Sequence, residues 1–433
     1  MSTHRARLLV SGDFHLGRYP SRIPADAPGL DVASVVRSLV DAALERRVDA
    51  VVLTGDMADQ ANKHYEAFGV LERELGRLAS AGIPVVAVAG NHDHDVAGAV
   101  ADALPGDGVR VIGRGQRWEA VPVVRDGREL VRLVGWSFAG PRVTETPLAS
   151  FAADLGEPLV GVTVPVVGVL HADLDQPGSP YAPVALADLR AQPVAAWLLG
   201  HCHAPRAHEE GGALVLYPGS PQPLDPGEPG AHGVWLVDVD ADGTTTARLL
   251  PLATLRYDRL DADLDGVETL SEARSRVLSV LQDHAAEIRR DHPTLRRAVA
   301  DVRLTGRTSV FGAADRLAAE LTGDDLSIDG LAVRVDRVRL ALRPALDLET
   351  LGSGSGPVAS LARMARRFEA GDLAPADRVL LAEAGDALRE ARRSRLFDPL
   401  AREERFEADV EAEALRRLHR QTLRLLDAAL TSA

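Results

Sequence analysis

The chain has 433 residues, which predicts two or three domains at about 150 residues per domain. Its hydrophobic content of 46% is enough for a large core, and its single cysteine excludes a disulfide framework and fits a reducing compartment. The formal net charge of −14 argues against a protein that coats nucleic acid non-specifically, but it leaves room for a nucleic-acid enzyme with a local positive site.

The amino terminus is polar and runs directly into a predicted strand. No apolar run is long enough to span a bilayer, and no signal peptide is recognisable. We therefore expect a cytoplasmic protein with no membrane partner.

The first half of the chain alternates short apolar strands with amphipathic helices. Strands are predicted at 8–10, 50–53 and 85–89, with helices at 31–46 and 65–80 between them. This order predicts an α/β fold with a parallel sheet covered by helices. Further strands are predicted at 131–134, 166–170, 195–199, 214–217 and 234–237.

Three polar residues, Asn91, His92 and Asp93, follow the apolar run at 85–89 and Gly90. Open α/β sheets place their ligand sites at this end of a strand. Asn91 offers a neutral oxygen to a metal, His92 can move a proton near neutral pH, and Asp93 can hold the imidazole in one orientation. Taken alone, the stretch also fits a polar loop without function.

Four other strand ends carry side chains of the same types. They are Asp13 with His15, Asp56 after Gly55, His171, and His201 with His203. Residues two apart share a face of an extended segment, so each two-residue pair can reach one ion. One such strand end is weak evidence, whereas five in succession predict a metal site. Oxygen and imidazole donors without thiolate suit Mn²⁺, Fe²⁺ or Zn²⁺ better than a structural zinc.

Taken in chain order, from Asp13 to His203, these five motifs resemble the calcineurin-like metallophosphoesterase superfamily. The resemblance implies a metallophosphoesterase α/β/β/α sandwich and two divalent metal ions, with Mn²⁺ as our first choice. It implies one metal held by Asp13, His15, Asp56 and His203, and a second held by Asp56, Asn91, His171 and His201, with Asp56 bridging. His92 and Asp93 would be the catalytic residues, His92 acting on the phosphoryl group or leaving oxygen and Asp93 orienting it.

A second stretch, 217–221 with 223–225 and Gly227-Glu228, resembles the SbcD-like branch of DNA repair nucleases. This resemblance implies a DNA exonuclease or endonuclease, the nuclease subunit of a repair complex, with DNA as its substrate. Some repair nucleases carry a histidine three residues after the bridging Asp, where this chain has Asp59. The alternative function is a metallophosphoesterase of the same superfamily that acts on a small molecule or a phosphoprotein. The intact ligand set argues against a non-catalytic scaffold.

We expect three domains: a nuclease domain at 1–255, an α+β capping domain at 256–350, and a Gly-Ser linker with a helical partner-docking region at 351–433. In the middle domain, residues 269–272 form a capping box before a helix, and a second helix is predicted at 313–321. A strand is predicted at 255–264, and half-buried strands are predicted at 299–304 and 331–335, where apolar and polar residues alternate. Its arginines either touch a phosphate backbone or form a solvated face; they are Arg296, Arg297, Arg303 and Arg307.

Beyond the Gly-Ser stretch at 352–357, the chain is helical and charged. Two apolar stripes have helical spacing, one of Leu361, Met364 and Phe368, and one of Leu415, Leu418, Thr422, Leu425 and Ala429. They either pack within the chain or dock on the helices of a partner. In the SbcD-like branch the partner is a coiled-coil, SMC-like ATPase; a homodimer is a further option. Asp59 and His64 are the next candidates for a proton donor after His92.

Overall fold

The computed structural model spans residues 1–433 and describes all of them except 1–3, 25–26, 60–64, 104–107, 393–404 and 432–433. The chain divides into two compact units. The first comprises Met1–Arg259, His284–Ala300 and Asp325–Asp336, and the second comprises Leu260–Asp283, Asp301–Asp324 and Arg337–Ala433. The three domains expected in chain order, with boundaries after residues 255 and 350, stay a prediction.

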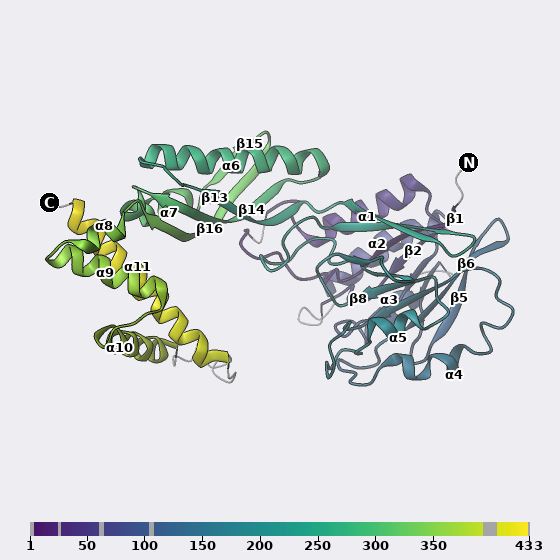
Figure 1. Cartoon of the computed structure of the whole chain (residues 1–433). Helices are drawn as coiled ribbons and strands as arrows, with labels where there is room; N and C mark the ends of the chain where they lie inside the picture. Colours follow the sequence, from purple (N-terminus) through teal and green to yellow (C-terminus); the bar gives the residue numbers. More distant parts are fainter. Residues whose placement is uncertain (1–3, 25–26, 60–64, 104–107, 393–404, 432–433) are drawn as a thin grey trace. The chain divides into compact units, whose positions relative to one another are not determined.

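Six of the described strands form the first sheet of the first unit, of which Figure 1 labels β1 and β2. In spatial order they are β12 (Thr245–Pro251), β11 (Gly233–Asp240), β1 (His4–Ser11), β2 (Ala50–Leu53), β3 (Val85–Ala87) and β4 (Val109–Val111). β1 to β4 are parallel, and β11 and β12 extend the sheet in antiparallel fashion. Ser11 lies opposite Leu53, and Leu53 opposite Ala87, so the carboxyl ends of β1, β2 and β3 are level.

Six further strands form the second sheet of the same unit. Their order is β5 (Glu119–Arg125), β6 (Arg128–Trp136), β7 (Val166–His171), β8 (Ala196–Gly200), β10 (Leu214–Tyr217) and β9 (Arg206–His208). The four inner strands are parallel, and the two edge strands β5 and β9 are antiparallel to them. His171 lies opposite Gly200, so the carboxyl ends of β7 and β8 are also level.

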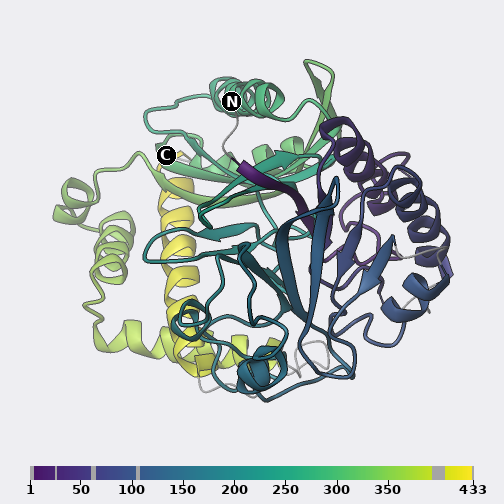
Figure 2. The same cartoon turned by 90° about the vertical axis from the view of Figure 1, so that its right-hand side faces the viewer.

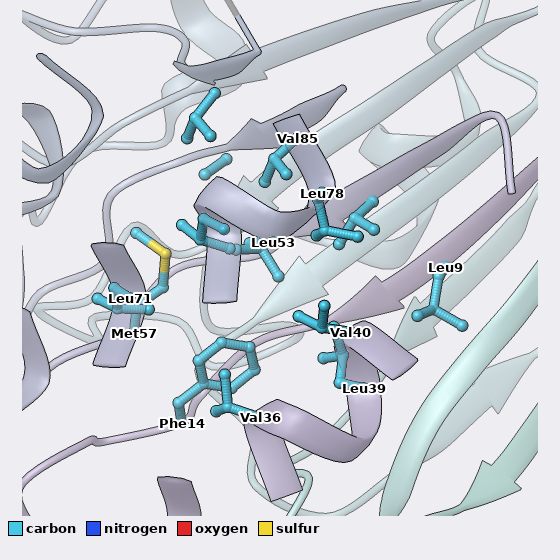
Figure 3. Close-up of a cluster of buried hydrophobic side chains, with 14 of the residues drawn as sticks. Leu9, Phe14, Val36, Leu39, Val40, Leu53, Met57, Leu71, Leu78 and Val85 are labelled. Atoms are coloured by element: carbon cyan, nitrogen blue, oxygen red, sulfur yellow. The ribbon is translucent and has the colours of Figure 1, made fainter. Parts of the chain in front are cut away.

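The strands of the first sheet face two hydrophobic cores. Leu9, Leu53 and Val85 point toward helices α1 (Val32–Arg46), α2 (Tyr65–Ser80) and α3 (Ala97–Ala103), as Figure 3 shows for the first two helices. These helices, purple to blue in Figure 2, cover the outer face of the sheet. The alternate residues, such as Leu8 and Val52, pack against the second sheet. Burial on both faces explains why these strands read as continuous apolar runs.

The outer face of the second sheet has a core of its own. Trp118, Phe151 and Trp197 pack there with aromatic ring centroids 4.9 to 5.9 Å apart, beneath α4 (Phe151–Leu155) and α5 (Leu186–Arg190). The layers are therefore helices, sheet, sheet, helices. This order confirms the α/β/β/α sandwich that the sequence predicts.

A third, antiparallel sheet has the order β13 (Leu255–Asp263), β14 (Arg297–Thr308), β16 (Leu331–Pro344) and β15 (Asp325–Ile328), with α6 (Leu270–Asp291) along it and α7 (Ala314–Leu321). The predicted capping box begins α6. Glu272 accepts a hydrogen bond from the Thr269 backbone N–H at 3.1 Å, and Thr269 Oγ1 accepts one from the Glu272 N–H at 3.2 Å. The α+β character of this region is as predicted.

The described residues after Asp347 form four helices, α8 (Leu348–Ser353), α9 (Pro357–Ala370), α10 (Pro375–Arg392) and α11 (Arg405–Thr431). Both α9 and α10 pack on α11. The predicted linker is shorter than its composition indicates, because Gly352 and Ser353 end α8 and Arg363 donates hydrogen bonds to the Gly352 and Gly354 carbonyls.

Most of the two predicted apolar stripes is covered within the chain. Phe368 and Thr422 are buried, but Leu425 is 53% exposed, so the described part of the chain does not cover this residue of the predicted α11 stripe. The buried line of α11 instead runs through Ala414 and Leu426. Within the described part of the chain, no helix is both long enough and apolar enough to cross a bilayer.

Candidate metal centre

The strand ends bring the predicted ligand residues together. Asp13, Asp56 and His171, from the ends of β1, β2 and β7, have ligand atoms within 4.8 Å of one another. The same holds for Asp13, His15 and His203, and for His15, Asp56 and His92. Side chains from both sheets therefore share one cluster, and Asp13, His15, Asp56 and His171 are almost completely buried in it.

The backbone around this cluster is strained. Asp13, His15, Asp56 and His201 have φ angles of 51°, 47°, 51° and 98°. Residues other than glycine rarely adopt this left-handed region, and such strain concentrates at functional sites. Gly90 contributes by lacking a side chain, because a Cβ there would lie 2.2 Å from Asp56 Oδ1. The strands and turns thus hold the carboxylates close together at a conformational cost.

The His171 ring is held by a backbone hydrogen bond at its outer nitrogen, Nδ1, which points away from the cluster. Its Nδ1–H donates to the Thr54 carbonyl at 3.0 Å, which leaves the lone pair on Nε2. That Nε2 lies 3.0 Å from Asn91 Oδ1 and 3.4 Å from Asp56 Oδ2. Three acceptor atoms that meet in a buried space require a cation between them, either a proton on His171 or a metal ion.

His203 is arranged in the same way on the other side of the cluster. Its Nδ1–H donates to Glu228 Oε1 at 2.8 Å, and Glu228 in turn accepts the Ser220 hydroxyl at 2.8 Å. The lone pair on His203 Nε2 therefore faces His15 Nε2, 3.0 Å away. The Nδ1 of His15 has no hydrogen-bond partner among the described residues, but a carboxylate oxygen of Asp59 lies 3.6 Å from it.

His201 lies at the margin of the cluster. Its ring centroid is 5.3 Å from that of His171, and its backbone N–H donates to Asp13 Oδ1 at 3.0 Å. Its Nε2 lies 3.3 Å from Asp173 Oδ1, and Asp173 also accepts the Ser179 hydroxyl. If Nε2–H donates to Asp173, the lone pair of His201 is on Nδ1.

His92 and Asp93 differ from each other in environment. The His92 ring is half-buried and makes an edge-to-face contact with His15, with centroids 4.8 Å apart. Asp93 is buried, and its two oxygens accept the backbone N–H groups of Met57 and Gly90 at 2.7 Å each. This is a correction, because Asp93 connects the loops after β2 and β3 and does not orient the His92 imidazole.

The buried charges shift one another's pKa values. Burial alone would raise the pKa of Asp56, but the neighbouring His171 and His15 imidazoles lower it well below its usual range. Burial would lower the pKa of His171, yet the Asp56 carboxylate raises it to about 9. Burial lowers the pKa of His92, so its imidazole is neutral at pH 7. The cluster therefore attracts positive charge to the space beside Asp56 and His171.

The donor set fits divalent cations. It consists of carboxylate, amide oxygen and imidazole, and the outer nitrogens of His171 and His203 are held by acceptors so that their inner lone pairs converge. The sequence predicted no role for the acceptors Thr54 and Asp173, and it placed Glu228 only in the stretch that resembles the SbcD-like branch. The alternation along an extended segment could have pointed to Asp173, two residues after His171. His64, a candidate proton donor, lies outside the described residues.

Comparison with known proteins identifies the class. The model of the calcineurin-like phosphoesterase superfamily domain matches residues 7–242. The chain therefore belongs to the calcineurin-like phosphoesterase superfamily, whose members use a dinuclear metal site.

Individual relatives are more distant. The chain is 29% identical to the uncharacterized metallophosphoesterase YhaO of Bacillus subtilis over 243 residues, 54% of this chain and 56% of YhaO. It is 28% identical to the DNA double-strand break repair protein Mre11 of Haloferax volcanii over 278 residues, 63% of this chain and 58% of Mre11. It thus spans a little over half the length of these curated relatives. A dimetal phosphatase from Danio rerio matches 56% of this chain and 98% of its own at 14% identity and a TM-score of 0.36.

Proposed function

We propose that the protein is a DNA nuclease that hydrolyses phosphodiester bonds with two divalent metal ions, Mn²⁺ by preference. The observation that carries the proposal is the gathering of carboxylate, amide and imidazole donors from five strand ends into one buried cluster. The similarity to Mre11, a DNA double-strand break repair protein, supports DNA as the substrate. The Tyr217 to Glu228 stretch supports the SbcD-like branch.

The residues divide into two overlapping ligand sets in this proposal. Asp13, His15, Asp56 and His203 hold one metal, and Asp56, Asn91, His171 and His201 hold the other. When bound, the two ions neutralise phosphoryl charge and lower the pKa of the attacking water. Asp56 serves both sets, in keeping with its central position between His15 and His171 at 3.8 and 3.4 Å.

The chain's own side chains provide the remaining chemistry. Glu228 and the Thr54 carbonyl accept the Nδ1–H protons of His203 and His171, so each ring presents its Nε2 to the cluster as the atom that would bind metal. The neutral His92 imidazole carries one N–H, which can donate to a phosphoryl or leaving oxygen. Asp93 keeps the loop of His92 attached to the loop of Asp56 through Met57 and Gly90.

The experiment compares substrates with the full-length protein. Labelled linear duplex, hairpin and single-stranded DNA are incubated with Mn²⁺, next to bis-p-nitrophenyl phosphate and a phosphoserine peptide. We expect DNA to be cleaved in Mn²⁺ and left intact in EDTA. Efficient turnover of the small ester or the phosphopeptide with every DNA form intact would favour the alternative, a small-molecule or phosphoprotein phosphoesterase.

A further inference from the structure

A polar cavity in the second unit has no part in the metal centre. Its volume is about 500 Å³, within the usual range of small-molecule sites, and four separate elements line it. They are the end of β14, the connection from β16 to α8, the third turn of α9 and the second half of α11. All its lining residues belong to the second unit.

Basic side chains from different elements meet at this cavity. Arg307 comes from β14, Arg343 from β16, Arg366 from α9 and His419 from α11. Arg343 is paired with Glu369 at 2.9 Å. The guanidinium groups of Arg307 and Arg366 make no hydrogen bond or ion pair with any residue that the structure describes. Two guanidinium groups that make no direct hydrogen bond or ion pair within the described residues are available to bind an anion at this cavity.

The acidic side chains at the cavity are mostly occupied. Asp347 caps α8, accepting hydrogen bonds from the Glu349 and Thr350 N–H groups and from the Thr350 hydroxyl. Glu369 is taken by Arg343, and Glu349 lies at the cavity as well. The hydrogen bonds from Thr350 lower the pKa of Asp347, and the Arg307 guanidinium lies near enough for its charge to contribute. Within the described residues, however, neither Asp347 nor Glu369 forms an ion pair with Arg307 or Arg366.

His419 adds a neutral donor or acceptor. Its Nε2 is buried and has no hydrogen-bond partner among the described residues. Burial lowers the pKa of His419, so the ring is neutral at pH 7 and does not add to the repulsion between the arginines. A buried polar atom without a partner is unfavourable, and a ligand oxygen would satisfy it.

We propose that this cavity is a second anion-binding site, which holds a phosphate group between Arg307, Arg366 and His419. Guanidinium groups recognise phosphate oxygens by paired, charge-assisted hydrogen bonds, and the imidazole would complete the set. The chain as a whole carries a net charge of −14, so a polyanion needs such a local basic site to be held. The phosphate belongs either to a free phosphorylated molecule or to a nucleic-acid backbone. The site does not depend on the proposed hydrolysis.

The test measures binding to the full-length protein in EDTA, where the metal centre cannot hold phosphate through metal ions and no substrate is consumed. Pyrophosphate is titrated by calorimetry, and a labelled DNA duplex by fluorescence anisotropy. The variant is Arg307→Ala with Arg366→Ala. The matched control is Arg378→Ala with Arg389→Ala, which removes two arginines from α10 outside the cavity. Melting temperatures show that each variant is folded.

We expect wild type and the α10 control to bind pyrophosphate with one site per chain, and the cavity variant to bind about tenfold more weakly or worse. If DNA binds and competes with pyrophosphate, the phosphate comes from a nucleic-acid backbone; if only pyrophosphate binds, the ligand is a free phosphate compound. The proposal is overturned if wild type binds neither probe, or if the cavity variant and the control bind equally well. If the wild-type protein binds pyrophosphate in EDTA but cleaves no DNA in Mn²⁺, the proposed nuclease function is contradicted and the anion site is not.

Discussion

Three imidazoles of the candidate metal centre, His171, His201 and His203, have an acceptor at the ring nitrogen that points away from the cluster. Thr54 O serves His171, Glu228 serves His203, and Asp173 faces His201. The candidate ligands could be predicted because each directly follows an apolar strand. Their acceptors could not, since Thr54 and His171 are 117 residues apart in sequence and only the register of two sheets joins them. Adjacency in the sequence was also a poor guide to contact. It predicts that Asp93 orients His92, whereas the Asp93 oxygens accept hydrogen bonds from the backbone N–H groups of Met57 and Gly90.

Glu228→Gln should weaken metal binding about 10–100-fold, because loss of the carboxylate behind an imidazole ligand typically has this effect. The amide keeps the size of the side chain, so the fold should be retained. Calorimetric titration of the metal-free protein with Mn²⁺ measures the change. The control is Asp225→Asn, an exposed carboxylate three residues earlier that bonds only to nearby backbone. Equal affinity in wild type and Glu228→Gln would contradict this role.

His92→Ala should retain its metal ions but lose roughly 10²–10⁴-fold in single-turnover cleavage rate, the usual worth of a general acid or base. His92 touches the ring of His15 but stands outside the two ligand sets proposed above. His94→Ala, two residues along the chain, is the control and should cleave at nearly the wild-type rate. A His92→Ala protein without metal would identify His92 as a ligand or as structural, and one with full activity would exclude it from catalysis.

At the scale of elements, the strands and helices with strong periodicity were predictable. β2 and α2 have the predicted bounds, and the buried faces of α6 include Ala273, Val277 and Leu281 as expected. Sequence patterns did not reveal β5, β9 and β12, edge strands whose exposed polar residues interrupt the apolar signal. The composition of the Gly-Ser stretch predicts a flexible linker, whereas in the structure Arg363 donates hydrogen bonds to two of its backbone carbonyls.

The α9–α10 turn depends on one buried carboxylate. Asp377 is 0% exposed and accepts Arg367 Nε at 2.5 Å, Arg367 Nη2 at 3.0 Å and the Ala374 N–H at 3.0 Å. Asp377→Asn should lower the free energy of unfolding of the second unit by about 1.5–3 kcal/mol, the usual worth of hydrogen bonds to a charged group. Hydrogen exchange of the α9 and α10 amides at pH 7 measures the loss. Asp386→Asn, whose side chain is 78% exposed, should show no change.

The same pair sets a pH dependence. The hydrogen bond from Arg367 lowers the pKa of Asp377 below its ordinary value of 3.8. The ionised Asp377 carboxylate therefore stabilises the folded state fully above pH 3.8, and this stabilisation is lost as the pH falls through the lowered pKa. We expect the melting temperatures of wild type and Asp377→Asn to converge as the pH decreases through this range. A difference that stays constant down to the lowest pH at which both fold would contradict the ion pair.

At the scale of the whole molecule, the candidate metal centre belongs to the first unit and the C-terminal helices to the second. Helices α9 and α10 pack on α11, and Leu381, Leu388, Val410 and Ala414 form a buried cluster between α10 and α11. Val379 and Leu380 on α10 remain 58% and 37% exposed. We propose this pair as the surface on which a coiled-coil, SMC-like ATPase docks.

Val379→Glu with Leu380→Glu should abolish co-purification with the ATPase and leave Mn²⁺-dependent DNA cleavage unchanged, because the metal centre is in the other unit. We use point substitutions because deleting the C-terminal helices would also remove the ion pair between Arg424 of α11 and Asp315 of α7, and could unfold the second unit. The control replaces Glu383 and Asp386 on α10 by glutamine and asparagine. Co-purification of the Val379/Leu380 variant at the wild-type level would show that α10 is not the docking surface.

The most direct test of the account is the metal content of Asp56→Ala beside its activity. Wild type and variant are loaded with Mn²⁺, freed of excess metal, and analysed by mass spectrometry and by DNA cleavage in parallel. We predict two Mn²⁺ ions per wild-type chain, fewer than one in Asp56→Ala, and cleavage only by wild type, because Asp56 serves both ligand sets. Two ions retained by Asp56→Ala, or undiminished cleavage by a variant that has lost its metal, would contradict a phosphodiesterase site built on this residue.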